Sequence, residues 1–351
     1  MFLKKIFGLY IVKFFCVCYN KIDKILICEK GGFIMAKRRR SKKMKKKVMR
    51  SLTTLVLLLI IGVISMIFQP WQYLDGNQGG DKDPVGDRTE ANVTDLQVHY
   101  IDMGQADSIL IRVPTENGTK NMLIDAGTSD GYKQQVLLDY LDNVGVETLE
   151  YMIVTHPHSD HNAAALKVLK TYNVENLILP ECETEQKTWL NMLEWMDEQN
   201  KEYIPSKVGD TYQIGDASFE ILGPATSKVK DPNDYSVVIR LDYGENKFLF
   251  MGDAEVASEE AMLKASDASK FKCDVLKVGH HGSESSTGSA FLAAADPSLA
   301  IIMCGEGNEY GHPDSVVVER LQKANVSVLR TDLEGSIVIC SDKKEVYRLT
   351  K

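Results

Sequence analysis

The chain has 351 residues, of which 44% are hydrophobic and 26% are charged. These values are ordinary for a globular protein, and the length is enough to bury a core in one large domain or two small ones. The formal net charge of −8 is unevenly divided, because residues 1–69 carry 16 Lys and Arg but only two acidic residues, which leaves a net −22 from Pro70 onward. A basic front on an acidic body suggests a membrane-facing tail on a soluble domain. The seven cysteines have no metal-ligand spacing and therefore indicate no cysteine-based metal site.

The N-terminal part predicts a single membrane anchor. Residues 35–50 form a basic segment, and residues 51–69 contain an uncharged apolar run, Leu52–Phe68, at the short end of the length that spans a bilayer. Because a basic flank stays in the cytoplasm, everything after Pro70 is expected outside the cell. A cleaved signal peptide is the alternative, but no small-residue cleavage site follows the run.

Residues 1–34 read as an aromatic, Lys-rich leader without a clear period. The stretch Lys30–Ile34 could be encoded by a ribosome-binding sequence, so we expect translation to begin at Met35, whose MAKRRRSKK sequence is typical of a membrane-protein start. The alternative is a genuine first apolar segment, Ile6–Val17, which is too short and too charged to span.

Residues 70–93 are rich in Gly and Asp and predict a flexible linker before a domain at 94–351. In the first half of that domain, apolar alternation and helical spacing predict strands and helices. The predicted strands are Leu96–Ile101, Ser108–Val113, Asn121–Asp125, Tyr151–Thr155 and Glu175–Leu179. The predicted helices are Tyr132–Asn143, Ala163–Tyr172 and Thr184–Gln199.

The second half continues in the same way. Its predicted strands are Phe219–Leu222, Ser236–Leu241, Lys247–Met251, Asp274–Val278, Leu299–Met303, Val326–Arg330 and Ser336–Cys340. Its predicted helices are Ala257–Ala265, Ser289–Ala294 and Ser315–Ala324. Many strands with interspersed helices predict an α/β fold of two sheets covered by helices, in one domain.

The strongest chemical signal is the segment Thr155–His161 (THPHSDH), which lies between a predicted strand and a predicted helix. It holds three of the chain's seven histidines and one aspartate, at a spacing that neither a helix face nor a strand face can bring together. We expect a loop at the strand end, where α/β proteins place their sites. Imidazole and carboxylate ligands together suit Zn²⁺, with Mn²⁺ or Fe²⁺ as less selective choices. The alternative, a polar loop with locally hydrogen-bonded histidines, leaves this clustering unexplained.

The segment resembles the HxHxDH hallmark of the metallo-β-lactamase superfamily. That resemblance implies a four-layer αββα sandwich with two divalent metal ions, Zn²⁺ in the first place and Mn²⁺ as the alternative. It implies His156 and His158 as ligands of the first ion, Asp160 and His161 as ligands of the second, and Asp253 as the bridge. Further segments match the family in order: Leu123–Gly127, Phe250–Ala254 and Val278–Ser283.

A finer resemblance is to the β-lactamase-like domain of the ComEC competence proteins and its free-standing relatives. It runs from about Leu96 to Cys340 without the many membrane helices of the ComEC channel. Three segments carry it: Ile101–Ser108, Lys277–Ser283 and Tyr310–Pro313. Ala106 stands where the family usually has Gly, and His158 is present where ComEC relatives often lack histidine, which favours an intact metal site.

True lactamases place another histidine between the HxHxDH loop and the bridging aspartate, but this chain has none between His161 and Asp253. The first ion would then be held by His156, His158, Asp253 and solvent. Open positions on the ion favour phosphoesters over β-lactams.

The resemblance implies a two-metal mechanism, in which ions roughly 3.5–4 Å apart lower the pKa of a shared water that then attacks phosphorus or a carbonyl. Asp160 therefore counts among the catalytic residues as well as the ligands. If Val278–Ser283 is extended, only one of His280 and His281 can easily face the metals. We assign His281 to the metal and His280 to protonating the leaving oxygen, or to supporting a ligand. His312 is expected to bind the substrate's anion at the rim, or else to lie in an ordinary turn.

Four other polar positions have weaker assignments. Asp102 and Asp107 are expected to orient metal ligands. Asp125 is at least as well explained as a structural carboxylate at a strand end, and His99 as a core or surface residue of a strand. Asn233–Val237 matches a polar turn beside the site in ComEC relatives, or is simply a turn that enters a strand.

Three functions compete. The first is an extracellular, membrane-anchored phosphodiesterase or nuclease, with the acidic body as an objection to duplex binding and with Lys270, Lys272 and Lys277 as a possible local basic patch. The second is a cell-envelope phosphoester hydrolase, for example one that acts on phosphocholine. The third is a non-catalytic DNA-uptake component. No obligate protein partner can be inferred.

Overall fold

The structure is a computed structural model that describes residues 24–29, 32–37, 85–92, 94–225 and 231–350. The chain divides into two compact units, Met1–Gln78 and Gly79–Lys351. In the first unit, β1 (Lys24–Glu29) and β2 (Gly32–Lys37) pair as an antiparallel hairpin, which the sequence did not predict. The predicted membrane span and most of the basic segment lie outside the described residues. No helix in the described part of the chain has the length and apolarity needed to cross a membrane.

The second unit contains a first sheet with nine strands among the described residues, in the order β3-β18-β17-β4-β5-β6-β7-β8-β9. Strands β17, β4, β5 and β6 pair antiparallel, whereas β6, β7, β8 and β9 run parallel. Their bounds are β3 Gly86–Arg88, β4 Leu96–Tyr100, β5 Ile109–Thr115, β6 Gly118–Ile124, β7 Thr148–Ile153, β8 Asn173–Leu179, β9 Ile204–Pro205, β17 Ile337–Ser341 and β18 Val346–Leu349.

The second sheet has seven strands among the described residues, in the order β10-β11-β12-β13-β14-β15-β16. Strands β10 to β13 pair antiparallel, and β13 to β16 run parallel. Their bounds are β10 Thr211–Ile214, β11 Ala217–Gly223, β12 Val238–Tyr243, β13 Asn246–Phe250, β14 Val275–Lys277, β15 Leu299–Ile302 and β16 Ser327–Arg330.

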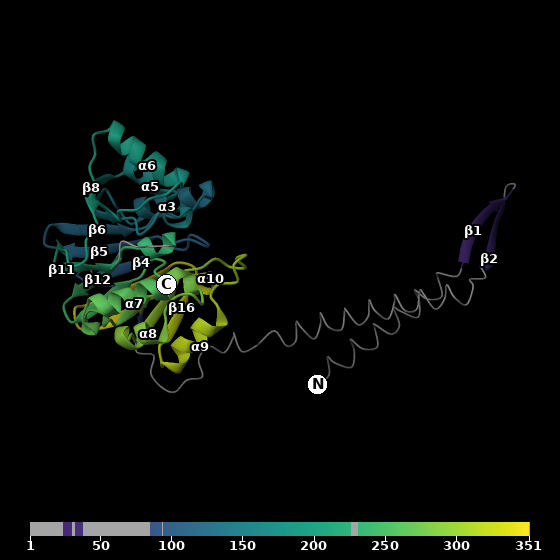
Figure 1. Ribbon diagram of the computed structural model, residues 1–351. Coiled ribbons are helices and arrows are strands. Elements are labelled where there is room, and N and C mark those ends of the chain that lie inside the picture. The colour runs from purple at the N-terminus through teal and green to yellow at the C-terminus, as the bar shows by residue number, and fades with distance from the viewer. Residues whose placement is uncertain (1–23, 30–31, 38–84, 93, 226–230, 351) are drawn as a thin grey trace. The chain divides into compact units, whose positions relative to one another are not determined.

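Helices cover the outer face of each sheet, so the second unit has four layers (Figure 1). The first sheet is covered by α3 (Gly131–Asn143), α5 (Ala165–Thr171) and α6 (Lys187–Glu198), and the second by α7 (Val256–Ala265), α8 (Ser289–Ala295) and α9 (Ser315–Lys323). Helix α3 shows how the sequence sets these elements. Asp130 caps its N-terminus by accepting from two backbone N–H groups, and Leu137, Leu138 and Leu141 pack inward.

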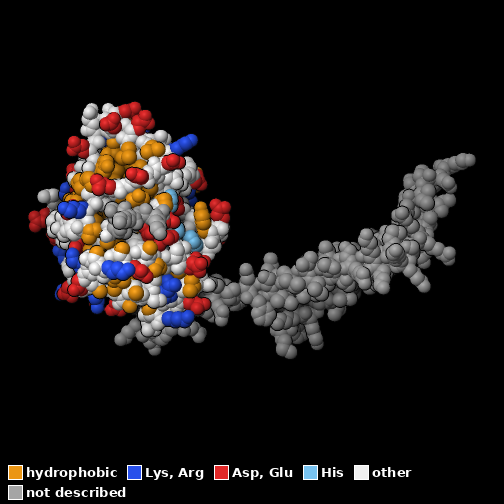
Figure 2. Space-filling view, viewed as in Figure 1, with side chains coloured by type: hydrophobic (Ala, Val, Ile, Leu, Met, Phe, Trp, Pro, Cys, Tyr) orange, Lys and Arg blue, Asp and Glu red, His pale blue; other side chains and the backbone are white. Residues whose placement is uncertain are grey.

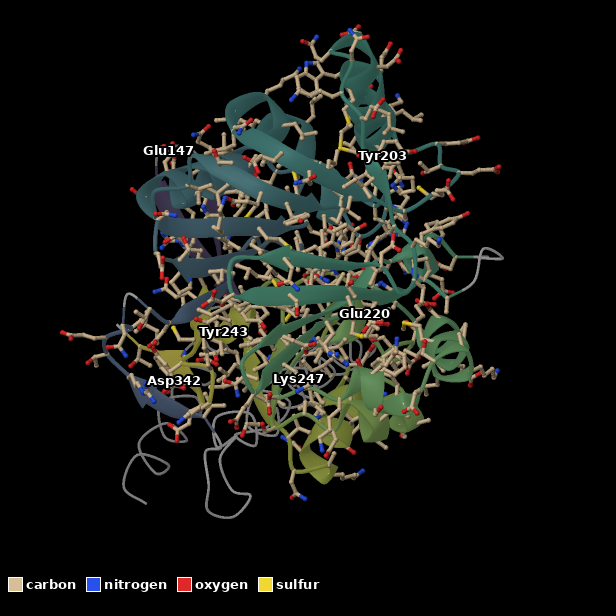
Figure 3. The ribbon with its side chains drawn as sticks, turned by 90° about the vertical axis from the view of Figure 1, so that its left-hand side faces the viewer. Glu147, Tyr203, Glu220, Tyr243, Lys247 and Asp342 are labelled. Carbon is tan, nitrogen blue, oxygen red and sulfur yellow. The ribbon has the colours of Figure 1, made fainter. Side chains whose placement is uncertain are left out.

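A hydrophobic core between the sheets joins the two halves of the domain. It contains alternate residues of strands from both sheets, such as Val98 and Ile111 from the first and Phe248 and Phe250 from the second. Figure 3 shows the strands stacked in side view, with Tyr243 of β12 labelled on the second sheet. The expectation of one domain with two sheets covered by helices is therefore confirmed.

The predicted strands and helices of the domain are present, most of them shifted by one to three residues at an end. The boundary at residue 94 is wrong, because β3 pairs in parallel with β18 and the domain therefore begins within the predicted linker. Strands β3, β9, β10 and β18 were not predicted. Each has at most four residues, and β3 contributes the polar sequence GDR, so it carries no hydrophobic pattern to detect.

Candidate metal centre

The THPHSDH segment follows β7 and leads into a short helix, α4 (Ser159–Asn162). His156 and His158 lie on the loop as expected, but Asp160 and His161 lie on the helix, so the loop is shorter than predicted. Helix α4 is held close to the segment that follows β6, because Ala126 N donates to His161 O at 2.8 Å. Gly127 is required at this approach, since a Cβ there would lie 1.6 Å from the Asp160 backbone oxygen.

Asp253 lies just after β13 of the second sheet and points its carboxylate among these histidines. Ser236 Oγ accepts from the Asp253 backbone N–H at 2.9 Å and so fixes the turn. Four imidazole Nε2 atoms surround the Asp253 Oδ2 atom, at 3.2 Å for His161, 3.6 Å for His281, 3.8 Å for His280 and 3.9 Å for His156. One carboxylate oxygen surrounded by ring nitrogens from both sheets is the arrangement expected of a metal-bridging aspartate.

Four of the predicted ligands come closest together, namely Asp160, His161, Asp253 and His281. One donor atom of each lies within 4.8 Å of the corresponding atoms of the other three. His161 Nε2, His281 Nε2 and Asp253 Oδ1 are buried and have no hydrogen-bond partner among the described residues. Buried polar atoms are normally paired, so donor atoms left free around one point fit a bound cation.

Hydrogen bonds to the far side of two rings fix which nitrogen faces the centre. His281 Nδ1 lies 2.8 Å from Met303 O, and since a carbonyl only accepts, Nδ1 carries a proton and Nε2 is the nitrogen that faces the centre. His161 Nδ1 lies 2.8 Å from Asp125 Oδ2, which orients it in the same way. Asp125 also accepts from the Thr155 backbone N–H and hydroxyl, at 2.7 and 2.8 Å. The residue left open as a structural carboxylate thus touches a predicted ligand.

The predicted ligands of the first ion are less tightly grouped. His156 is fully buried, and its Nε2 lies 3.2 Å from His158 Nδ1 and 3.9 Å from Asp253 Oδ2. His158 lies at the edge of the cluster. The structure therefore brings His156, His158 and Asp253 side by side without assembling a closed set of four donors there. Figure 2 shows histidine side chains reaching the surface of the domain, which agrees with a centre that is open to solvent.

The charges around the centre favour positive charge on two of the rings. Burial alone would lower the pKa of His281, but Asp253 and Asp107 outweigh it and raise that pKa to about 10. Burial also opposes a charge on His161, yet Asp253 and Asp125 hold its pKa well above the ordinary value. A divalent cation bound between these groups would take over the role of the protons.

A buried ion pair connects the two sheets beside the centre. Lys277 of β14 is fully buried, and its Nζ lies 2.6 Å from Asp107 Oδ2. Burial alone would raise the pKa of Asp107, but Lys277 and His281 outweigh it and keep that pKa below its usual value. The other Asp107 oxygen lies 3.4 Å from His281 Nδ1, as expected for a residue that orients a ligand. Asp102 was wrongly given this role, since it accepts from Gly104 N and pairs with Lys133 away from the ligands.

The possible basic patch of Lys270, Lys272 and Lys277 is not formed. Lys277 is buried, as described above, while Lys270 pairs with Glu220 at 2.5 Å and Lys272 with Asp296 at 3.5 Å. None of the three presents an uncompensated charge to a substrate, so these lysines do not offset the acidic body in duplex binding.

Both histidines of the His280–His281 pair face Asp253. The expectation that only one could do so assumed an extended backbone, and that assumption is wrong. The pair lies in η4 (Gly279–Gly282), where both histidines adopt left-handed backbone angles, with φ of 46° and 52°. This turn directs both Nε2 atoms to within 3.8 Å of Asp253 Oδ2.

His280 is the more exposed of the two and has a second carboxylate behind it. Its side chain is 23% exposed, and its Nδ1 lies 3.1 Å from Glu255 Oε1, which also accepts from Ser285 Oγ at 2.8 Å. Asn233 Nδ2 lies 3.5 Å from His280 Nε2, so the predicted polar turn is indeed beside the centre. Sequence reasoning missed Glu255, although its position two residues after Asp253 was an available signal.

His312 lies at the rim of the centre. Its ring meets that of His280 edge to face, with centroids 5.6 Å apart. Burial, followed by the neighbouring His280 and His281, lowers the pKa of His312, so this ring is neutral near pH 7 and could meet an anion through an N–H group only. His99 is buried in β4 against Tyr140, in agreement with a core position.

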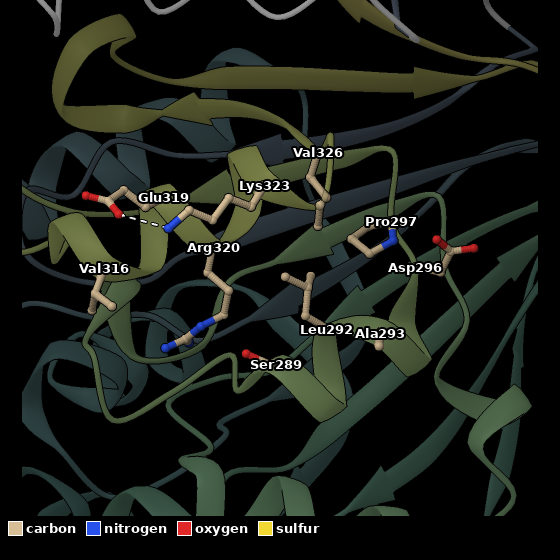
Figure 4. Close-up of a pocket in the computed structure, with 11 residues that line it drawn as sticks. Ser289, Leu292, Ala293, Asp296, Pro297, Val316, Glu319, Arg320, Lys323 and Val326 are labelled. Atoms are coloured by element: carbon tan, nitrogen blue, oxygen red, sulfur yellow. Dashed lines mark hydrogen bonds and ion pairs between the residues drawn. The ribbon is translucent and has the colours of Figure 1, made fainter.

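A groove of about 530 Å³ lies between α8 and α9 (Figure 4). It is lined by apolar side chains such as Leu292 and Val326 and by the Glu319–Lys323 ion pair. Arg320 at its floor donates to the carbonyl oxygens of Ser286 and Thr287. None of the predicted ligands lines this groove, so the metal chemistry belongs to the junction of the sheets.

A layered α/β sandwich with a histidine–carboxylate cluster where its sheets meet defines a metal-binding hydrolase fold. A family model for the metallo-beta-lactamase superfamily matches residues 101–306, and the chain belongs to this superfamily. The predicted family and its four-layer αββα sandwich are therefore confirmed.

Relatives of the ComEC type are also found. The chain is 32% identical over 255 residues to ComE operon protein 3 of Bacillus subtilis (strain 168), which covers 69% of this chain and 32% of that protein. It is 31% identical over 244 residues to Recombination protein 2 of Haemophilus influenzae, with 69% and 28% covered. The chain thus spans about a third of the length of these relatives. Among solved structures, the metallo-beta-lactamase fold protein YhfI from Bacillus subtilis matches with a TM-score of 0.43 and 12% identity, over 67% of this chain and 95% of that one.

Proposed function

We propose that this protein is a metal-dependent phosphodiesterase that acts outside the membrane in which its N-terminal segment is anchored. The observation that carries the proposal is the Asp253 carboxylate, surrounded by four imidazole Nε2 atoms contributed by both sheets. Buried lone pairs without partners next to carboxylates form a donor set for Zn²⁺, with Mn²⁺ as the alternative.

Two ions are proposed at this centre. His156, His158 and Asp253 would hold the first, and Asp160, His161, His281 and the shared Asp253 the second. Bound there, the ions would activate a water for attack and stabilise charge on the phosphate oxygens.

The chain's own residues supply positioning and proton transfer. Asp125 and the Met303 carbonyl keep the ring nitrogens of His161 and His281 pointed at the centre. His280 is partly exposed and held by Glu255, so it is placed to give a proton to the leaving oxygen.

Phosphodiesters are favoured as substrates for two reasons. No histidine occurs between His161 and Asp253, so open positions remain for phosphate oxygens. The relatives include proteins named for competence and recombination, namely Competence protein ComA of Neisseria gonorrhoeae and Recombination protein 2. Because the body carries −22 and the lysines near the centre are paired, single-stranded nucleic acid is a better candidate than a duplex.

One observation favours a second candidate, an envelope phosphodiester with a cationic group such as phosphocholine. An open hollow is lined by Glu183, Glu185 and Pro232, next to the Asn233 turn that contacts His280. Acidic side chains there would attract a quaternary ammonium and repel a polyanion.

Metal analysis of the full-length protein followed by assays on four substrates tests the proposal. The substrates are bis-p-nitrophenyl phosphate, single-stranded DNA, p-nitrophenylphosphorylcholine and nitrocefin. We expect two divalent ions per chain and hydrolysis of bis-p-nitrophenyl phosphate, both lost in Asp253→Ala. Hydrolysis of nitrocefin without phosphodiesterase activity would refute the proposal, and a preference for the choline ester over DNA would favour the second candidate.

The anchor is tested separately by protease treatment of intact cells. Digestion of the domain from outside, with the N-terminal segment protected, is expected. N-terminal sequencing of the expressed protein identifies the first residue, for which Met35 is our expectation.

A further inference from the structure

Tyr310 presents an aromatic face to solvent close to the metal centre. It lies in the loop between β15 and α9, and 65% of the residue is exposed. One face of its ring stacks on His312, with centroids 5.7 Å apart and planes inclined by 23°. His312 in turn meets His280, whose Nε2 lies 3.8 Å from Asp253 Oδ2. A row of three rings therefore leads from the central carboxylate to the surface and ends in an open tyrosine face.

The loop that carries this ring is fixed by side-chain hydrogen bonds. The Asn308 amide donates to Gly305 O at 2.9 Å and to His312 O at 2.6 Å, and its oxygen accepts from His312 N at 3.0 Å. Gln105 from the first sheet's side accepts from Gly305 N at 3.1 Å. Since the backbone on both sides of Tyr310 is held, a partner could dock on its ring at little cost in conformational entropy.

An uncharged, flat and exposed face in this place suits a flat π-system. Every nucleobase has such a face, and stacking on an aromatic side chain contributes to single-strand binding without sequence preference. The charges of the domain favour such a contact, because Lys270, Lys272 and Lys277, the lysines considered for a basic patch, are buried or paired. Stacking would add affinity for a nucleic acid strand that these lysines do not supply.

We propose that Tyr310 stacks on the nucleobase next to the scissile phosphodiester and so selects nucleic acid strands over other phosphodiesters. This inference rests on the proposed phosphodiesterase function and adds a substrate-selecting residue to it. His312 stacks on the inner face of the Tyr310 ring and would hold that ring in place, so that its outer face is free for the base.

Three p-nitrophenyl phosphodiesters with the same leaving group test the proposal on the full-length protein. They are the 5′-esters of thymidine and of abasic 1′,2′-dideoxyribose, and the methyl ester. We expect Tyr310→Leu to lower kcat/KM for the thymidine ester about tenfold or more, chiefly through KM, and to leave the other two unchanged. Tyr310→Phe keeps the ring and is expected to match the wild type. Because the side chain is mostly exposed, unchanged thermal unfolding of both variants is also expected.

Each other outcome has a definite meaning. Equal losses of kcat/KM on the thymidine and abasic esters in Tyr310→Leu would show that the ring binds the sugar. No loss on any ester would show that the ring binds neither the sugar nor the base. Either result overturns the stacking proposal. If the wild type hydrolyses none of the three esters although it binds two metal ions, the phosphodiesterase proposal itself fails, and the stacking proposal fails with it.

Discussion

The buried pair of Lys277 and Asp107 gives the sharpest prediction about stability. With 2.6 Å between the charged atoms and both side chains at most 1% exposed, the attraction is about 6 kcal/mol at an effective dielectric constant of about 20. Lys277→Met removes that attraction and leaves Asp107 charged and buried. Breaking a buried pair in this way costs about 3–5 kcal/mol, and we expect a loss of that size in the free energy of unfolding.

Urea unfolding of the full-length protein, with and without a chelator, measures the effect. The double variant Lys277→Met, Asp107→Asn removes both charges and should recover a large part of the loss, which a double-mutant cycle reports as a coupling energy. Lys272→Met is the matched control, since Lys272 pairs with Asp296 on the surface with 65% and 71% of the side chains exposed, and should change stability by less than about 1 kcal/mol. A loss for Lys277→Met no larger than for this control would refute the reasoning.

Each of the next three predictions concerns one residue. Gly127→Ala places a Cβ 1.6 Å from the Asp160 backbone oxygen and should displace α4, so bound metal measured by elemental analysis should fall well below two ions per chain. The control Gly131→Ala, with no atom within 4 Å of its Cβ, should retain both ions. Equal metal content in the two variants would contradict the prediction. Burial raises the pKa of Glu259 to about 7, so the folded state holds the Glu259 carboxyl proton more tightly than the unfolded chain, and the free energy of unfolding should fall by up to about 3 kcal/mol as pH rises from about 4.5 to about 7. Urea unfolding at pH 5 and pH 8 should show a smaller change in Glu259→Gln than in the wild type. An equal change in both proteins would disprove the assignment. The metal-free protein should release protons when Zn²⁺ is added at pH 8, because His281 has a pKa of about 10 at this buried position and must lose a proton to bind the ion. Calorimetry in two buffers of different ionisation enthalpy would detect the release. Zinc binding without proton release would contradict the assignment of His281 as a ligand.

The sequence identified the centre where several chemically unusual residues are close together in the chain. Three histidines and an aspartate within THPHSDH needed no structure to be recognised, because that density has no structural explanation. Asp253 was found through resemblance, since one aspartate after an apolar strand carries no local signal of its own. The alternation of apolar residues was equally sufficient for the long central strands, whereas β3 and β9 at the sheet edges are held mainly by backbone pairing.

What the sequence could not supply was the direction in which side chains point. The prediction for His280 and His281 failed because two successive left-handed residues without glycine are rare, and an extended segment was the reasonable assumption. Lys277 was considered for a basic patch, but it is buried against Asp107, a partner that is distant in the chain. Both errors concern tertiary contacts. Asp107 of the other sheet compensates the buried charge of Lys277, and the turn at His280 is held by Gly252 O after β13, which accepts from the His280 backbone N–H.

The centre is divided between the two sheets, although most of the contacts that hold its side chains come from within one sheet. Among the predicted ligands, the segment after β7 of the first sheet supplies His156, His158, Asp160 and His161, and the segments after β13 and β14 of the second sheet supply Asp253 and His281. Asp253 and two of the four rings around it come from the second sheet and the other two rings come from the first, so an ion held here would link the two halves of the sandwich. The Lys277–Asp107 pair makes the same connection without metal, and it lies against His281. The chain can therefore keep its two sheets in register, and its ligands aligned, before an ion arrives.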